Sequence, residues 1–214
     1  MNLAQLFPAE VVVVSATPEM WTTPLLHEEE LLIREAISKR QREFRAGRHC
    51  ARTALAELGL PKVPILRDEK RAPIWPPGYL GSISHCDDYC LAACCAIGSV
   101  QGLGVDVEPL APLNSELAGY IHSKTETAFM HAHPELPPRI IFSAKESLYK
   151  CFYPLVKRFF GFHAVELHID LYNQCFSFIS TGEISLELPE GVVFHGSYLI
   201  HQGHLVTGCY LIRA

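Results

Sequence analysis

The chain has 214 residues, of which 49% are apolar and 19% charged, with a formal net charge of −5. This length fits one large domain or two lobes of roughly 100 residues each. The apolar content excludes a disordered chain, and the negative net charge argues against a nucleic-acid-binding protein.

The first half of the chain predicts strands and two amphipathic helices. Apolar residues at helical spacing indicate the helices, and Gly59 follows the second as a C-terminal stop. Pro109 ends the last strand by removing a backbone donor. The predicted elements are strands over 11–15, 81–85, 90–97 and 103–108 and helices over 27–39 and 41–58.

The second half repeats the order of helices followed by strands. Ser123 and Glu126 form a capping-box signature that opens a short helix. The other predicted elements are a helix over 138–152 and strands over 164–171, 176–179, 184–188, 195–201 and 204–212. The repetition predicts an α+β fold of two lobes, 1–104 and 105–214.

The N-terminal segment bears on the location of the protein in the cell. No basic region precedes an apolar stretch, and the run at 11–14 is too short for a signal peptide or a membrane helix. We therefore expect a cytoplasmic protein without a membrane span.

Cys86, Cys90 and Cys94 repeat every four residues, as in a metal site on a helix. A buried strand with small thiols is the better interpretation of this segment.

One segment of this acidic chain is strongly basic. Residues 34–52 hold seven basic side chains against two glutamates, a local charge of +5. Arg45, Arg48 and Arg52 follow helical spacing and line one face of the predicted helix. Such a face is either solvated or part of an anion site.

The segment 104–108, Gly-Val-Asp-Val-Glu, places two carboxylates on one strand. Residues two apart point to the same face, so Asp106 and Glu108 project together while Val105 and Val107 face the core. Two close carboxylates repel each other unless a cation lies between them, and oxygen ligands suit magnesium. The alternative is an exposed strand edge with two solvated acids.

A second segment, 142–150, lies on the predicted helix over 138–152. Glu146 and Lys150 are four residues apart and share a helix face. Taken alone, they are equally consistent with an ordinary surface ion pair. A third segment ends in Ser84 and His85, where a strand gives way to a turn. Its hydroxyl, imidazole and backbone amides are able to hold a phosphate, although a turn histidine without function fits the same pattern.

The three segments together, in this order, resemble the surfactin-type 4′-phosphopantetheinyl transferases, and within them the enterobactin synthase component D branch. That family carries a serine–histidine pair, G-[IV]-D-[IVL]-E and [WF]-[ST]-x-K-E-[SA]-x-x-K, matched here at 84–85, 104–108 and 142–150. The branch also tends to carry F-x-x-G-R-x-x-A and P-x-W-P, which occur at 44–51 and 73–76.

The resemblance implies two pseudo-twofold-related lobes with coenzyme A in the cleft between them. Asp106, Glu108 and Glu146 would coordinate Mg²⁺ together with the pyrophosphate of coenzyme A. A serine hydroxyl of a carrier protein would attack the β-phosphate, and 3′,5′-ADP would leave. The implied catalytic residues are Asp106, Glu146 as the base, directly or through water, and Lys150 as a pyrophosphate ligand and acid.

The remaining implied contacts concern coenzyme A and the acceptor. Ser84, His85 and Lys150 would bind phosphates of the donor. The implied 3′-phosphate ligands are Arg40, Arg48, Arg52 and Thr53, with Arg71 as a further one. The acceptor would be an acidic peptidyl, aryl or acyl carrier domain of siderophore or other nonribosomal peptide synthesis, with Lys124, Lys157 and Arg158 as candidate contacts. Two fused lobes complete one site, so we expect a monomer.

Three alternatives stay open. The first is a non-catalytic module that binds coenzyme A or a carrier protein. The second is another magnesium-dependent phosphotransferase. The third is an interaction protein with a structural zinc at Cys86–Cys95. No G-x-x-x-x-G-K-[ST] motif is present, which weighs against a nucleotide phosphotransferase of that type.

Overall fold

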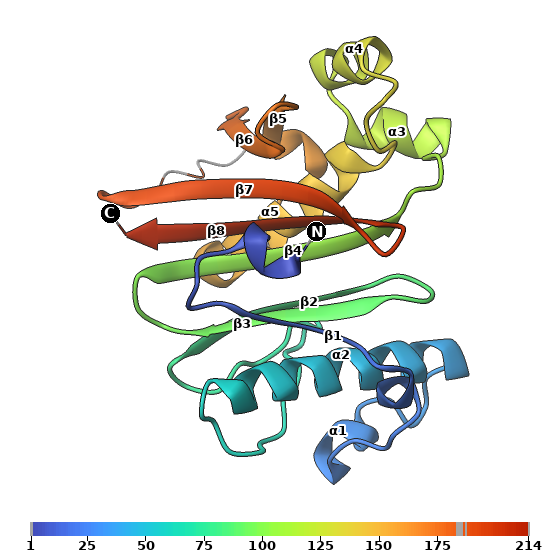
Figure 1. Ribbon diagram of the computed structural model, residues 1–214, viewed down its shortest axis with the longest axis vertical. Coiled ribbons are helices and arrows are strands. Elements are labelled where there is room, and N and C mark those ends of the chain that lie inside the picture. The colour runs from blue at the N-terminus through green and yellow to red at the C-terminus, as the bar shows by residue number, and fades with distance from the viewer. Residues whose placement is uncertain (1, 183–185, 187, 214) are drawn as a thin grey trace.

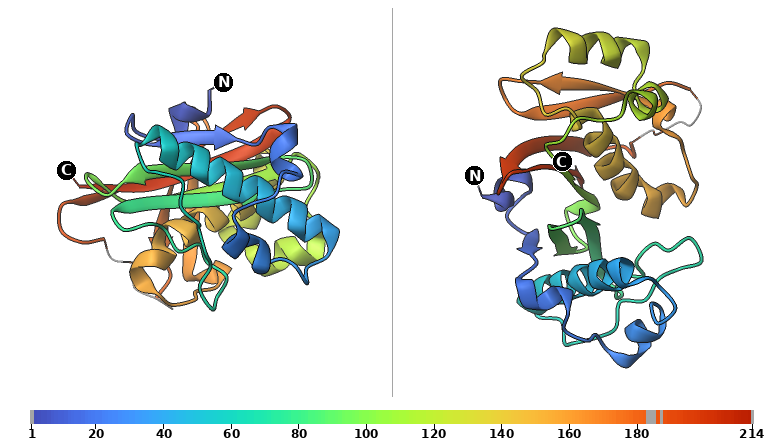
Figure 2. Two further views of the ribbon diagram at one scale, coloured as in Figure 1. Left: turned by 90° about the horizontal axis from the view of Figure 1, so that it is seen from below. Right: turned by 90° about the vertical axis from the view of Figure 1, so that its right-hand side faces the viewer.

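Two antiparallel sheets lie edge to edge, and helices cover each of them (Figures 1 and 2). The computed structural model describes residues 2–182, 186 and 188–213. The predicted α+β class with small antiparallel sheets and packed helices is confirmed. Within this described part, no helix has the length and apolar character that crossing a membrane requires.

The first sheet has the strand order β1-β3-β2. Its helix α2 carries small side chains, such as Ala46, Cys50 and Ala54, that pack on the equally small residues of β3. The elements of this part are the 3-10 helices Leu3–Leu6 and Pro18–Trp21, β1 (Val12–Ser15), α1 (His27–Leu31), α2 (Ser38–Glu57), β2 (Tyr79–His85) and β3 (Cys90–Ala96).

The second sheet has the order β4-β8-β7-β6-β5, and α5 packs on β4 and β8. A long apolar face of α5, from Ile140 to Phe152, is buried against this sheet. The elements are β4 (Val100–Pro109), α3 (Ser115–Ile121), α4 (Lys124–Ala132), α5 (Ile140–Val156), the 3-10 helix Phe162–Ala164, β5 (Val165–Asp170), β6 (Cys175–Ser180), β7 (Val192–His201) and β8 (His204–Arg213).

Serine side chains join the two sheets along β2 and β4. The amide of Val105 donates to the hydroxyl of Ser82 at 3.0 Å, and the amide of Val107 donates to that of Ser84 at 3.2 Å. Each hydroxyl satisfies a buried backbone donor that would otherwise cost free energy. The alternating serines of β2 thus place the edge of the first sheet against the carboxylate-bearing strand of the second.

The close contact between β4 and α5 depends on Gly104. A Cβ atom at this position would lie 1.9 Å from the carbonyl oxygen of Ser147 on α5. Because only glycine permits this approach, the glycine of the Gly-Val-Asp-Val-Glu segment has a packing function. It brings Asp106 on β4 beside the helix that carries Glu146 and Lys150.

Several sequence expectations differ from the structure. The predicted helix over 27–39 was wrong in extent: α1 ends at Leu31, and the side-chain amide of Gln41 then binds three main-chain carbonyls of residues 33–36 that a continuous helix would use. Helix α3, capped by Asn114, was not predicted. The predicted strand 184–188 lies mostly outside the described residues. The predicted lobe boundary, 104–105, falls within β4 and stays a prediction, as does the pseudo-twofold relation.

Candidate active site

Lys150, Asp106 and Ser84 meet where α5, β4 and β2 come together. The Lys150 ammonium donates to Asp106 Oδ1 at 2.7 Å and to the Ser84 hydroxyl at 2.9 Å. The Ser84 hydroxyl in turn donates to the same Asp106 oxygen at 2.7 Å. As predicted, Val105 and Val107 are fully buried on the opposite face of β4.

Asp106 has a second carboxylate oxygen with a different environment. Its Oδ2 is buried and has no hydrogen-bond partner in the structure. A buried carboxylate oxygen left unpaired is costly, so it marks a position where a further cation would be stabilised. The donor set around it, oxygen atoms only, fits a hard divalent cation such as Mg²⁺.

Glu108 and Glu146 complete a group of three carboxylates. Burial raises the pKa of Glu146, and the charges of Asp106 and Glu108 raise it further, against the opposing effect of Lys150. Burial and the Asp106 charge also raise the pKa of Glu108, although Arg139 binds it at 2.7 Å. The smaller part of each pKa shift, which comes from the neighbouring carboxylates, indicates that negative charge gathers here.

The three carboxylates are nevertheless not drawn together to metal-ligand spacing. Within the described ranges, the group of His, Cys, Asp or Glu side chains whose ligand atoms all lie within 4.8 Å of one another is Cys86, Asp88 and His204. The three carboxylates therefore fit a cation in chemistry and in charge, although their oxygens do not all lie within 4.8 Å of one another.

A basic cluster adjoins the carboxylates through His85. Arg40 Nη1 lies 2.9 Å from the Nε2 atom of His85, and burial lowers the pKa of His85. Arg48 is buried, donates to the neutral main-chain carbonyls of residues 65 and 66, and has its pKa lowered to about 10 by burial, with Arg40, Arg52 and Arg67 lowering it further. Glu43 lies 3.5 Å from Arg40 and 3.8 Å from His85, and the charge of Glu29 acts on Arg48, so part of this positive charge is compensated. The remaining positive charge favours an anionic ligand. Arg67 was not singled out from the sequence.

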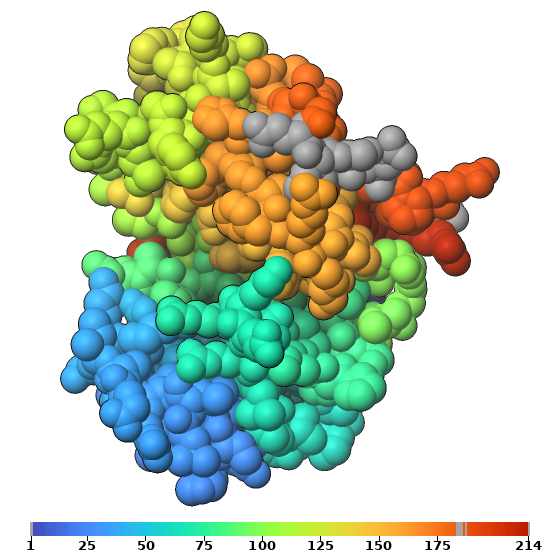
Figure 3. All heavy atoms as spheres, turned by 180° about the vertical axis from the view of Figure 1, so that it is seen from behind, coloured from blue at the N-terminus to red at the C-terminus, as the bar shows by residue number. Residues whose placement is uncertain are grey.

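A cleft lies along α5, between this helix, β2 and the loop after α2. The loop after α2 closes one side, and the end of α5 closes the other, as the teal and orange segments of Figure 3 show. Lys70, Arg71 and Lys150 bring three cations to its lining, and its volume is about 250 Å³. The Trp75 ring covers Gly81, where any Cβ would lie within 2.6 Å of the indole. The structure thus brings Arg71 to the same cleft as Lys150 and Glu146.

Arg52 and Thr53 lie elsewhere. The Arg52 guanidinium pairs with the carboxylate of Glu29, which is fully buried and also accepts the amide of Ile65 at 2.9 Å. Arg52 and Thr53 line a separate hollow together with His49 and Lys62. The predicted role of Arg52 and Thr53 in binding phosphate therefore stays a prediction, in a place away from Glu146 and Lys150.

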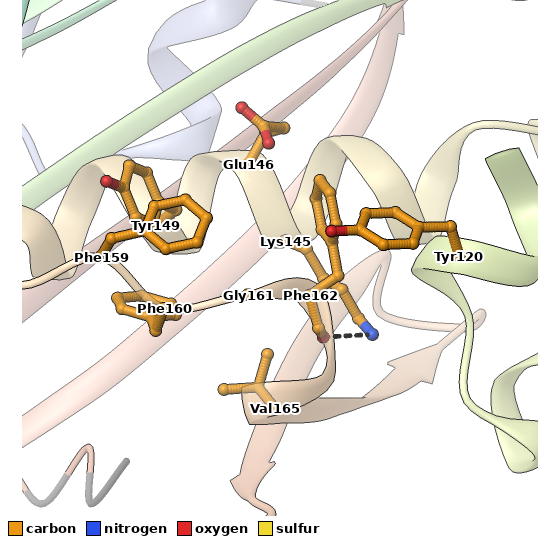
Figure 4. Close-up of a pocket in the computed structure, with 9 residues that line it drawn as sticks. All are labelled: Tyr120, Lys145, Glu146, Tyr149, Phe159, Phe160, Gly161, Phe162 and Val165. Atoms are coloured by element: carbon orange, nitrogen blue, oxygen red, sulfur yellow. Dashed lines mark hydrogen bonds between the residues drawn. The ribbon is translucent and has the colours of Figure 1, made fainter. Parts of the chain in front are cut away.

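An aromatic pocket opens on the other side of Glu146 (Figure 4). Tyr149 contacts Phe159 and Phe160 with ring centroids 5.8 and 5.0 Å apart, and Phe162 and Tyr120 close the far side. Its volume is about 270 Å³. Glu146 and Tyr149 line both this pocket and the basic cleft. The aromatic residues of this pocket, among them the adjacent Phe159 and Phe160, were not singled out from the sequence.

Comparisons with known proteins decide the family. The model of the 4′-phosphopantetheinyl transferase N-terminal domain matches residues 27–95, and that of the 4′-phosphopantetheinyl transferase superfamily matches residues 102–198. The 4′-phosphopantetheinyl transferase PptT of Mycobacterium tuberculosis is 34% identical over 98% of this chain and 97% of its own. The chain belongs to the 4′-phosphopantetheinyl transferase superfamily.

Other relatives in this superfamily agree. The 4′-phosphopantetheinyl transferase Npt of Nocardia iowensis is 36% identical over 84% of this chain and 74% of its own. Enterobactin synthase component D of Salmonella typhi is 41% identical over 59% of this chain and 57% of its own. The resemblance to the superfamily and to this branch is confirmed, and with it the enzyme class. The non-catalytic and other phosphotransferase alternatives are thereby set aside.

Within the transferase helix α5, the lysine before Glu146 has a structural place. The Lys145 ammonium is buried and donates to Glu126 at 2.7 Å and to the carbonyls of Ile121 and Phe162 at 2.9 Å. Glu126 also accepts the amides of Ser123 and Leu167, which confirms the predicted capping box. Lys145 thus ties α5 to the end of α3, to α4 and to the 3-10 helix Phe162–Ala164, and it has no contact with Asp106 or Glu108 among the hydrogen bonds of the described residues.

Proposed function

We propose that this transferase moves the 4′-phosphopantetheine group of coenzyme A to a serine of a carrier protein, with 3′,5′-ADP as the other product. Family membership supports the reaction. The observation that carries the proposed site is the unpaired, buried Oδ2 of Asp106 beside Glu108 and Glu146, next to a basic cleft.

We further propose Mg²⁺ as the cofactor, with Asp106, Glu108 and Glu146 as its protein ligands. The all-oxygen donor set and the mutual repulsion of the carboxylates support this choice. When bound, the ion would neutralise charge on the pyrophosphate and on the leaving group. The Arg139 guanidinium, which binds Glu108, would have to share that carboxylate with it.

The charges of the two hollows support an orientation for coenzyme A. The phosphates carry negative charge and suit the side of Arg40, His85, Arg71 and Lys150. The pantetheine arm is uncharged, with amide and methyl groups, and suits the aromatic pocket around Tyr149. Glu146 lies where the two hollows adjoin, so the scissile pyrophosphate bond would lie beside it.

The chain's residues then have separate tasks in the transfer. Glu146, or a water bound to it, takes the proton of the serine hydroxyl, whose oxygen forms a bond to the β-phosphorus while the bond to the leaving phosphate oxygen breaks. A raised pKa, caused mainly by burial, makes Glu146 a better base than an exposed glutamate. Lys150, already held by Asp106 and Ser84, stabilises or protonates the departing 3′,5′-ADP.

The acceptor of the phosphopantetheine group is a carrier domain. The branch supports a peptidyl, aryl or acyl carrier domain of siderophore or other nonribosomal peptide synthesis. Acidic carrier helices would suit Lys124, Lys157 and Arg158, and this contact should weaken as salt increases. The cytoplasmic location and the monomeric state stay predictions; light scattering after size-exclusion chromatography tests the second.

Mass spectrometry of a carrier domain tests the reaction. The full chain is incubated with coenzyme A, Mg²⁺ and an apo peptidyl carrier domain. We expect the carrier to gain one phosphopantetheinyl group and to lose this gain when EDTA replaces Mg²⁺. A carrier whose serine is replaced by alanine is the control. An unmodified carrier in the complete mixture, with several carrier types tried, would contradict the proposal.

A further inference from the structure

Two hairpin turns, one from each sheet, meet at the same end of the molecule (Figure 1). The turn between β2 and β3 carries Cys86 and Asp88, and the turn between β7 and β8 leads into His204. A sulfur, a carboxylate oxygen and an imidazole nitrogen of these three residues all lie within 4.8 Å of one another. Thiolate, carboxylate and imidazole are the ligand types that zinc takes in proteins.

The hydrogen bonds of His204 define its tautomer. Its Nδ1 atom lies 3.0 Å from the main-chain oxygen of Gln202, and a carbonyl oxygen only accepts, so Nδ1 carries a proton. In the neutral ring the lone pair is then on Nε2, which faces Asp88 Oδ1 at 3.0 Å. Two lone pairs at this distance repel each other, so either a second proton on the ring pairs it with Asp88 or a cation bound to both atoms takes the place of that proton. Histidines that bind metals commonly donate their other N–H to a backbone carbonyl in this way.

The spacing and the support of the group also suit a metal ion. Cys86 Sγ lies 3.7 Å from the same Asp88 oxygen that faces His204. Tetrahedral zinc with bonds of about 2.0–2.3 Å has ligand-to-ligand edges of roughly 3.3–3.7 Å. The Cys86–Asp88 separation lies in this range, whereas His204 Nε2 and Asp88 Oδ1, 3.0 Å apart, would move apart by a few tenths of an ångström to hold the same ion. The ring of Tyr89 stacks on His204 with centroids 4.9 Å apart, and the Tyr89 hydroxyl is held by Ser15 at 2.8 Å. The imidazole is therefore oriented before any ion binds.

Exposure leaves one side of the group open. The side chain of Asp88 is 77% exposed, whereas that of His204 is only 12% exposed. Solvent thus reaches the carboxylate, so an ion has an entry path and a water molecule can complete its coordination. The inner side is closed by the histidine and its stacked tyrosine.

We propose that Cys86, Asp88 and His204 bind a zinc ion, with water as the fourth ligand, and that this ion ties the two sheets together at their hairpins. Binding releases the thiol proton of Cys86, and any second proton on His204, to solvent. The site differs in chemistry from the oxygen-only carboxylate group of the cleft, which favours magnesium. The proposal is independent of the transferase reaction.

Cobalt binding provides a direct test, because Co²⁺ bound to a thiolate gives a sulfur-to-metal charge-transfer absorption that oxygen ligands do not. The full chain is reduced, stripped with EDTA, desalted and titrated with Co²⁺, after which Zn²⁺ is added. We expect the band to appear with one equivalent of Co²⁺ and to vanish on addition of Zn²⁺. Cys86→Ser and His204→Gln should each abolish the band, whereas Cys175→Ser, which removes another partly buried thiol, should keep it.

Thermal unfolding gives a second readout. Zinc should raise the unfolding midpoint of the wild type and of Cys175→Ser, but not that of Cys86→Ser or His204→Gln. Circular dichroism establishes that each variant is folded, and the two ligand variants serve as checks on each other. Absence of the band in the wild type, or its persistence in folded Cys86→Ser, would overturn the proposal. The first result would leave His204 and Asp88 as a simple ion pair.

Discussion

Lys150 Nζ lies 2.7 Å from Asp106 Oδ1, so one ion pair joins the helix α5 to the strand β4 at the edge of the cleft. The other oxygen of Asp106 is buried without a partner. The lysine therefore compensates only part of the local negative charge, to which Glu108 and Glu146 also contribute. Asp106 is thus both a packing contact and an open ligand position.

Asp106→Asn and Glu146→Gln test the carboxylate group. Each change preserves the shape of the side chain and removes its charge, so we expect phosphopantetheine transfer to fall by at least about 100-fold, as expected when charge stabilisation worth several kcal/mol is lost. Transfer is measured by mass spectrometry at several Mg²⁺ concentrations. Unfolding midpoints should stay close to wild type. Wild-type transfer rates in either variant would exclude that residue as a metal ligand.

Variants of Lys145 and Lys150 should separate an effect on stability from an effect on transfer activity. Lys145→Met leaves Glu126 buried without its cation, which should lower the free energy of unfolding by about 3–5 kcal/mol. Lys150→Met also takes the cation from a buried carboxylate, but Lys150 is partly exposed and Asp106 keeps the hydrogen bond from Ser84, so we expect a smaller loss of stability together with a strong loss of transfer. Urea unfolding and transfer rates of both variants are compared. The reverse pattern would show that the two lysines had been assigned to the wrong tasks.

Arg40 and Arg52 differ in their partners, so their alanine variants should differ in kinetics. Arg40→Ala should raise KM for coenzyme A more than KM for dephospho-coenzyme A, because Arg40 lies beside His85. Arg52→Ala should mainly lower the unfolding midpoint, because it leaves Glu29 buried and unpaired. If Arg52→Ala, in a folded sample, raises KM equally for both donors, Arg52 is not a 3′-phosphate ligand. An equal effect of Arg40→Ala would exclude Arg40.

Gly104→Ala should disrupt the packing of β4 on α5. The added Cβ would meet the main chain of Ser147, which cannot move aside as a flexible side chain does. We expect a loss of at least ~3 kcal/mol in the free energy of unfolding, or failure to fold. Gly119→Ala is the control, because a Cβ in α3 meets open space and should stabilise the helix by roughly 0.5–1 kcal/mol. Similar stabilities of the two variants would contradict this role of Gly104.

The ion pair of Glu30 should make the free energy of unfolding depend on pH in the acid range. The Arg45 guanidinium, bound at 2.8 Å, lowers the pKa of Glu30 from 4.5 to about 2. Its contribution is therefore complete above about pH 4.5 and is lost as the pH falls through about 2. Because the pair is partly exposed, we expect only ~1 kcal/mol. Urea unfolding of wild type and Glu30→Gln should differ at pH 6 and converge at low pH; a constant difference would refute the assignment.

The sequence by itself determined what depends on local spacing. Alternation along a strand puts Asp106 and Glu108 on one face and Val105 and Val107 on the other, and the capping box at Ser123 follows from three residues of separation. These features need only the backbone periods of strand and helix. The family motifs at 84–85, 104–108 and 142–150 were visible for the same reason, since each lies within one element.

Tertiary structure decided which partner each charged side chain meets. Lys145 and Lys150 lie on one helix, yet packing buries the first against Glu126 and leaves the second beside Asp106. Arg52 is paired by Glu29 from a separate helix, which no helical spacing indicates. His204 reaches Asp88 from the far end of the chain. Such contacts depend on how whole elements pack, and the burial that results sets the cost of each unpaired charge.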